Sequence, residues 1–123
     1  MRLRTRPASG GFELYAWFFM RVSGILLILL ALGHFGYMHL LNGVEKIDYE
    51  FVARQYRTPF WKTYDLLLLS LALVHGANGA RTLIDDYIHA RGWRALFLAA
   101  LYTASFFFLV VGALVIVTFQ RVR

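Results

Sequence analysis

Two of the four histidines lie inside long apolar stretches of the chain. His34 lies in the stretch from Tyr15 to Leu41, and His75 lies in the stretch that begins at Phe60. An ionisable side chain in hydrocarbon costs roughly 3 kcal/mol or more unless it is paired, so such a residue indicates a function. Neutral imidazole is a good axial ligand for haem iron, and two helices that each offer one histidine can hold the ring between them. Both histidines are therefore candidate haem ligands.

A polar stripe is predicted around His75. At roughly 100° per residue, positions on the same helix face recur every three to four residues. The residues that share this face with the histidine are Asn78, Gly79, Thr82 and Asp86. Gly76 and Gly79 leave room beside the imidazole, as a flat porphyrin lying against the helix requires. Small residues also permit close helix packing with nothing bound, so a purely structural role stays open.

The end of the same helix carries charged and phenolic groups. Arg81 lies about two turns beyond His75, where it can reach a haem propionate or pair with Asp85. Asp86 and Tyr87 follow about 16 Å along the helix from the histidine. A carboxylate beside a phenol at this depth can hydrogen-bond a quinone carbonyl and supply protons as the quinone is reduced. A simple polar helix terminus is the alternative interpretation.

The first apolar stretch repeats this local pattern, because His34 is flanked by Gly33 and Gly36. Ser23 lies eleven residues before His34 and hence on nearly the same helix face. We expect His34 to be a second haem ligand, with a histidine hydrogen-bonded to a neighbouring helix as the alternative. The other two histidines lie nearer polar segments and are expected at the membrane interface: His39 and His89.

Three long apolar helices are expected to position these groups. Each is longer than the ~20 residues that span the hydrocarbon. They cover about 15–41, 60–87 and 95–119. Residues 42–59 are mixed and charged, which predicts an extramembrane loop with a short interfacial helix around 49–56. The fold class is therefore all-α, an integral membrane protein with three transmembrane helices in one domain over residues 1–123.

The composition is that of a membrane protein. It is 59% hydrophobic with a mean hydropathy of +0.57, whereas a soluble domain is about half apolar. There is no cysteine, so the chain has no thiolate metal site and no iron–sulfur cluster of its own. The net charge of +6 comes from residues beside apolar segments rather than on a soluble face, which favours anchoring at lipid headgroups and argues against nucleic-acid binding. Lysines and arginines divide seven against six between the two sides, so charge does not fix the orientation.

The run HGANGAR from His75 to Arg81, followed by Asp86 and Tyr87, resembles the second transmembrane helix of a known family. That family comprises the cytochrome b membrane-anchor subunits of succinate dehydrogenase, or succinate:quinone oxidoreductase. In it, a His-x-x-x-Gly helix carries the axial haem ligand, and an Asp-Tyr pair eleven and twelve residues later borders the quinone site. This sequence keeps both spacings.

The first stretch adds a second resemblance. Arg21-Val-Ser23-Gly24 is similar to the His-Arg-(Ile/Val)-(Ser/Thr)-Gly motif of the larger anchor subunit, with Met20 in place of its histidine. Length, three spans and the order of the motifs favour the small hydrophobic anchor subunit. Ser23 is a candidate cofactor-binding residue whose role this motif leaves open.

The resemblance implies roles for individual residues. His75 is the axial ligand of haem b, and Tyr87 hydrogen-bonds the quinone. Asp86 orients the tyrosine or relays protons, while Arg21 and Arg81 assist the propionates or the quinone. In members with two haems, the first helices supply ligands to a distal haem. The residue here that fits that role is His34, so the resemblance implies one haem or two.

The expected partners follow from the ligand count. Three helices provide at most one histidine for each haem, so ligation by two histidines requires a second cytochrome b anchor subunit. The resemblance also implies a flavoprotein subunit with FAD that oxidises succinate and an iron–sulfur subunit that passes electrons to quinone. It implies a bacterial cytoplasmic membrane with the N-terminus in the cytoplasm. A fumarate reductase anchor and a haem-free membrane scaffold are the alternatives.

Overall fold

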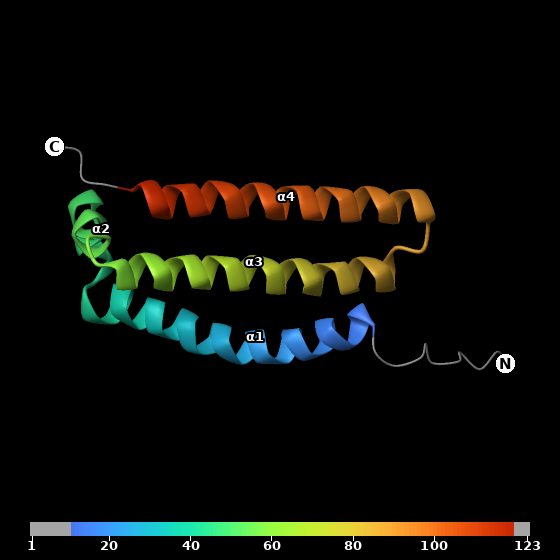
Figure 1. The fold of residues 1–123 in the computed structure, drawn as a ribbon, viewed down its shortest axis with the longest axis horizontal. Coiled ribbons are helices and arrows are strands. Elements are labelled where there is room, and N and C mark those ends of the chain that lie inside the picture. The colour runs from blue at the N-terminus through green and yellow to red at the C-terminus, as the bar shows by residue number, and fades with distance from the viewer. Residues whose placement is uncertain (1–10, 120–123) are drawn as a thin grey trace.

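The computed structural model describes residues 11–119, and within that range every regular element is a helix (Figure 1). The order is α1 (Phe12–Phe35), a π-helical continuation (Gly36–Leu41), a 3-10 turn (Val44–Lys46), α2 (Tyr49–Gln55), α3 (Pro59–Tyr87) and α4 (Arg91–Thr118). Five arginines counted in the charge balance lie outside the described residues: Arg2, Arg4, Arg6, Arg121 and Arg123.

The all-α class with three spans is confirmed. Three helices are long and apolar enough to cross a membrane: Phe12–Leu41, Pro59–Tyr87 and Arg91–Thr118. Each begins one to four residues earlier than hydropathy predicts. The reason is that hydropathy marks only the apolar part of a helix, whereas the helical backbone extends into a polar first turn. Pro59 at the start of α3 illustrates this, because its fixed φ suits the first helical turn.

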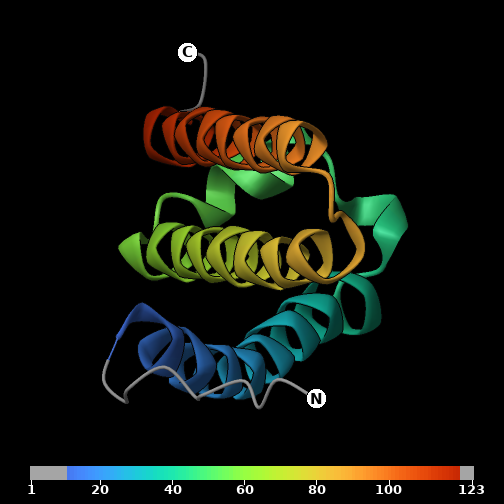
Figure 2. The ribbon, with the colours of Figure 1, turned by 90° about the vertical axis from the view of Figure 1, so that its right-hand side faces the viewer.

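The three long helices run antiparallel, with α3 between α1 and α4 (Figures 1 and 2). The contact between α3 and α4 is close at Gly112, where an added Cβ would lie 2.6 Å from Cδ2 of Leu69. Small residues permit this kind of approach between membrane helices. Because α3 is central, its side chains can reach both neighbouring helices, and it is the helix that carries His75.

The connection between α1 and α3 folds against the end of α4. It turns at Gly43, whose φ of 74° favours glycine, and α2 follows after Asp48, whose carboxylate accepts a hydrogen bond from the backbone N–H of Phe51 at 2.7 Å. The rings of Tyr49 and Tyr56 contact Phe119, with centroids 5.2 and 5.6 Å apart. The predicted interfacial helix around 49–56 is thus observed, and it lies beside the end of α4.

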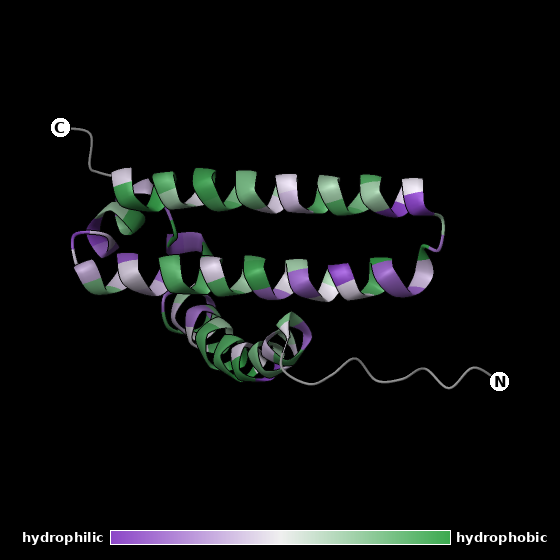
Figure 3. Ribbon diagram, turned by 45° about the vertical axis from the view of Figure 1, so that its right-hand side comes forward, coloured by the Kyte–Doolittle hydropathy of each residue, from purple (hydrophilic) through white to green (hydrophobic). Residues whose placement is uncertain are grey.

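The chain has little core of its own. Among residues 11–119, the buried apolar side chains are Met38, Ala53 and Ile116. Large aliphatic and aromatic side chains are exposed along all three long helices, and hydrophobic residues cover much of the ribbon in Figure 3. Apolar surface on this scale is favourable only against lipid or other helices. The chain is therefore a multi-pass membrane protein.

Candidate functional site

The side chain of His75 faces α1. Its Nδ1 lies 2.8 Å from Oγ of Ser23, a residue that is 1% exposed. The same Oγ lies 2.6 Å from the carbonyl oxygen of Phe19, one helical turn earlier. Gly24 lies beside the imidazole, because an added Cβ there would be 3.5 Å from Cε1 of His75. The histidine is therefore held on the inner face of α1 by one polar contact and flanked by a residue without a side chain.

A groove of about 550 Å³ runs along α1 beside this histidine. Its walls are Gly24, Leu27, Ile28, Ala31, Leu32 and His75. Apart from the imidazole, every lining side chain is apolar. An added Cβ at Gly76, next to the histidine, would meet no atom within 4 Å. An open apolar groove with one imidazole on its wall fits a flat macrocycle whose metal takes a histidine ligand.

The polar stripe predicted around His75 divides between two sides of α3. Gly79 faces α1, where an added Cβ would lie 3.5 Å from Cε of Met20. It therefore lies on the same side of α3 as His75. Asn78 instead lines a second cavity, and Thr82 donates its hydroxyl to the carbonyl oxygen of Asn78 at 3.1 Å. Gly79 thus has a packing role toward Met20, while Gly76 leaves open space.

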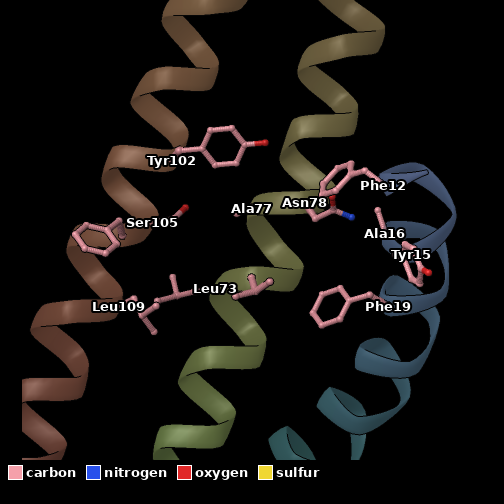
Figure 4. A pocket seen from close by; sticks show the side chains of 12 residues that line it. Phe12, Tyr15, Ala16, Phe19, Leu73, Ala77, Asn78, Tyr102, Ser105 and Leu109 are labelled. Atoms are coloured by element: carbon pink, nitrogen blue, oxygen red, sulfur yellow. The ribbon is translucent and has the colours of Figure 1, made fainter. Parts of the chain in front are cut away.

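The second cavity has a volume of about 410 Å³ and lies between α1, α3 and α4 (Figure 4). Aromatic and aliphatic side chains make up most of its lining, including Phe12, Phe19, Leu73 and Leu109. Asn78, Tyr102 and Ser105 add polar groups. His75 is not among its lining residues, so this cavity is separate from the groove beside the histidine.

Arg81 connects α3 to the beginning of α1. Its two terminal nitrogens donate to the two carboxylate oxygens of Glu13 at 3.1 and 3.2 Å, and one of them also lies 3.4 Å from Oδ2 of Asp85. Nε donates to Oδ1 of Asn78 at 3.3 Å. The pairing with Asp85 left open by the sequence is present. Glu13 is a partner that sequence reasoning missed, because nothing in a single helix pattern relates residues 68 positions apart.

Asp86 and Tyr87 end α3 on the surface. Both are exposed, with Tyr87 at 80%, so a substrate or a neighbouring subunit can reach them. Arg21 lies on the outer face of α1, where its guanidinium carbon is 3.6 Å from the centre of the Trp17 ring. It lies two residues before Ser23 and hence on the opposite side of the helix, away from His75.

His34 belongs to a second polar cluster at the other end of the long helices. Its Nδ1 lies 3.2 Å from Oδ1 of Asp65, and Oδ2 of the same carboxylate accepts a hydrogen bond from the hydroxyl of Tyr56 at 2.8 Å. The Asp65 side chain is only 10% exposed. Burial, and then the hydrogen bond and charge of Asp65, raise the pKa of the Tyr56 hydroxyl well above its ordinary range. The hydrogen-bonded alternative for His34 is thus observed, and it occupies one ring nitrogen.

The glycines beside His34 have different surroundings. An added Cβ at Gly33 would lie 2.6 Å from the hydroxyl of Tyr64, which donates to the carbonyl oxygen of Leu30 at 2.6 Å. Gly36 has no atom within 4 Å of an added Cβ. Gly33 therefore accommodates a tyrosine of α3. Asp65 could have been noticed from sequence, since a carboxylate at the edge of the run LLLLSLALV is costly without a partner.

Residues 5–117 match a family described as succinate dehydrogenase/fumarate reductase transmembrane subunit. The chain is similar to the succinate dehydrogenase hydrophobic membrane anchor subunit of Archaeoglobus fulgidus. The two are 33% identical over 79 residues, which is 64% of this chain and 67% of the relative.

Proposed function

The chain belongs to the succinate dehydrogenase/fumarate reductase transmembrane subunit family, and on that basis we propose that it holds haem b through His75 and borders a quinone site with Asp86 and Tyr87. As a member, it is a membrane subunit of an oxidoreductase complex. The observation that carries the proposal is the imidazole of His75 on the wall of an open apolar groove. We favour the direction of succinate oxidation because the relative described above is named for it.

The groove contributes binding and orientation. Leu27, Ile28 and Leu32 offer apolar contacts to a macrocycle, and His75 offers a ring nitrogen to its iron. Haem b, when bound, supplies a one-electron redox centre within the membrane. The groove provides one imidazole, so a second histidine ligand would come from a partner anchor subunit. The protein therefore works as part of a heteromer.

The end of α3 contributes the quinone site. The phenol of Tyr87 donates a hydrogen bond to a quinone carbonyl, and Asp86 orients the phenol or relays protons. Conversion of quinone to quinol takes two electrons and two protons. Oxidation of succinate to fumarate would supply both electrons, and FAD and iron–sulfur clusters in the flavoprotein and iron–sulfur subunits would carry them. Because Tyr87 is 80% exposed, those neighbours complete the site.

The remaining predicted residues keep subsidiary roles in the proposal. Arg81 lies at the same end of α3 as Tyr87 and brings positive charge toward a propionate or the quinone, although Glu13 already neutralises part of that charge. Arg21 would assist in the same way from the outer face of α1. His34 would be the ligand of a second haem, with Asp65 orienting its ring. The N-terminus lies in the cytoplasm, which places Tyr87 on the side of the iron–sulfur subunit.

The experiment is the reduced-minus-oxidised spectrum of the purified complex. We expect a b-type band that loses the contribution of one haem in His75→Ala, and disappears if the complex holds a single haem, but is unchanged in His89→Ala, whose histidine is exposed between α3 and α4. A wild-type complex without any b-type band contradicts the proposal and supports the haem-free scaffold. A band of undiminished intensity in His75→Ala shows that the ligand lies elsewhere.

A further inference from the structure

Ser23 is the side chain whose burial is most complete in the part of the chain that the structure describes, and its oxygen contacts His75. We infer that Ser23 is a positioning residue for the haem ligand: its hydroxyl oxygen accepts the Nδ1–H of His75 and so presents the Nε2 lone pair to the iron. The inference rests on the proposed function, because it concerns how this chain holds the same haem.

The direction of the hydrogen bond follows from the second contact of the serine. Oγ of Ser23 and the carbonyl oxygen of Phe19 are 2.6 Å apart, a separation at which two oxygens repel unless a proton lies between them. The carbonyl has no proton, so the hydroxyl of Ser23 must donate to it. A hydroxyl has one proton. Toward His75, 2.8 Å away, the same oxygen can therefore act only as an acceptor.

The tautomer of His75 follows from that direction. A neutral imidazole carries one N–H, and if Nδ1 is the donor, Nε2 holds the lone pair that a metal needs. Histidine ligands in metal sites generally donate their other N–H to an acceptor, which fixes the ring and makes it a stronger electron donor. Ser23 supplies that acceptor from the neighbouring helix.

Among the described residues that line the groove, none offers a polar side chain that could replace Ser23. The groove beside His75 is otherwise lined by Gly24 and by side chains that have no polar atom. Without the hydroxyl of Ser23, the imidazole would lose the one hydrogen-bond partner that it has among residues 11–119, and either tautomer and several ring orientations would become accessible. The serine thus determines which nitrogen faces the iron and in which plane the ring lies.

A serine in a membrane helix can also bond the preceding turn for purely structural reasons. Thr82 provides a comparison for this structural role. Its hydroxyl donates to the carbonyl oxygen of Asn78, four residues earlier, at 3.1 Å, and among residues 11–119 it has no hydrogen bond to a histidine. Thr82→Val removes that bond at constant shape. It is therefore a matched control for the loss of a back-bonded hydroxyl in a spanning helix.

The test uses the assembled complex and measures haem content, the haem midpoint potential and the low-spin ferric electron paramagnetic resonance signal. In Ser23→Ala we expect haem affinity to fall roughly 10- to 100-fold. We also expect the midpoint potential to move positive, since a weaker donor stabilises ferric iron less, and the resonance signal to shift as the ring turns. Ser23→Thr keeps the hydroxyl and retains the wild-type potential, and Thr82→Val retains all three properties.

Several results would overturn the inference. One is a Ser23→Ala complex with the wild-type potential and resonance signal; another is Ser23→Thr behaving like Ser23→Ala, which would assign the effect to packing. If Ser23→Ala does not assemble, Ser23→Cys replaces it, with a weaker acceptor and an intermediate shift expected. Failure of the proposed function looks different, because the wild-type complex would then lack the b-type band or His75→Ala would keep it at full intensity.

Discussion

Arg81 of α3 and Glu13 of α1 form a two-point ion pair, with the terminal guanidinium nitrogens 3.1 and 3.2 Å from the two carboxylate oxygens. The two residues are at the ends of different helices, so the pair fixes the beginning of α1 against the last third of α3. The guanidinium is 15% exposed and the carboxylate 76% exposed. Such a half-exposed ion pair adds modestly to the free energy of unfolding, and salt weakens it.

Glu13→Gln should lower the free energy of unfolding by about 0.5–1 kcal/mol, because it removes the charge that faces Arg81. Thermal unfolding of the complex at low and high salt measures this. The loss should shrink at high salt, where the pair is already screened. Glu45→Gln, at an exposed position in the loop before α2, serves as the control. Equal melting temperatures for Glu13→Gln and wild type at low salt would argue against the pair.

Gly33→Ala should destabilise the chain by about 1–3 kcal/mol, because the added methyl would lie 2.6 Å from the hydroxyl of Tyr64 and force that side chain off the carbonyl oxygen of Leu30 or the helices apart. Gly36→Ala is the matched control, three residues away with no atom within 4 Å of the added carbon. Denaturation of the purified complex measures both. Equal stability of the two variants would contradict the close contact between Gly33 and Tyr64.

Tyr56 should make stability depend on alkaline pH. Its pKa is raised in the folded protein by burial and by Asp65, so the folded state keeps a proton that the unfolded state loses above its ordinary value of 10.0. The stabilisation is therefore complete below about pH 10 and is lost as the pH rises toward the folded-state value. Tyr56→Phe should flatten the decline in stability measured above pH 10. An unchanged slope would mean that Tyr56 titrates alike in both states.

Tyr87→Phe should reduce quinone reductase activity at least about 10-fold while leaving succinate oxidation by a soluble artificial acceptor unchanged, because in the proposed site the phenol acts only at the quinone. The ratio of the two activities in the assembled complex is the measurement. Tyr37→Phe, at the opposite end of the long helices, keeps its ring contact with Trp61 and should leave the ratio unchanged. A normal ratio in Tyr87→Phe would remove the tyrosine from the proposed site.

Hydropathy and local patterns were sufficient to predict the three spans and the short helix near 49–56. They act within one segment, where apolar length and turn residues determine the outcome. The motif around His75 was also readable, because its spacing lies within a single helix. The exposure of Tyr87 follows from its place at a helix end.

Contacts between helices could not be predicted in the same way. Periodicity placed Ser23 on the face of His34, whereas the structure pairs it with His75 of α3. The rotation and height of one helix against another depend on how all their side chains pack, which a single-helix pattern does not contain. The Glu13 pair and the Asp65 cluster were missed for the same reason. The placement of Arg21 on the outer face, stacked on Trp17, likewise needed the packed helices.

Haem content per assembled complex, measured by pyridine haemochrome on wild type and on His75→Ala, is the most direct measure of whether His75 holds haem b. We expect at least one haem b per wild-type complex and one fewer in His75→Ala, with all subunits still assembled. A His34→Ala variant in the same series shows whether that histidine holds a second haem. Equal haem content in wild type and His75→Ala, or no haem in either, would contradict the account.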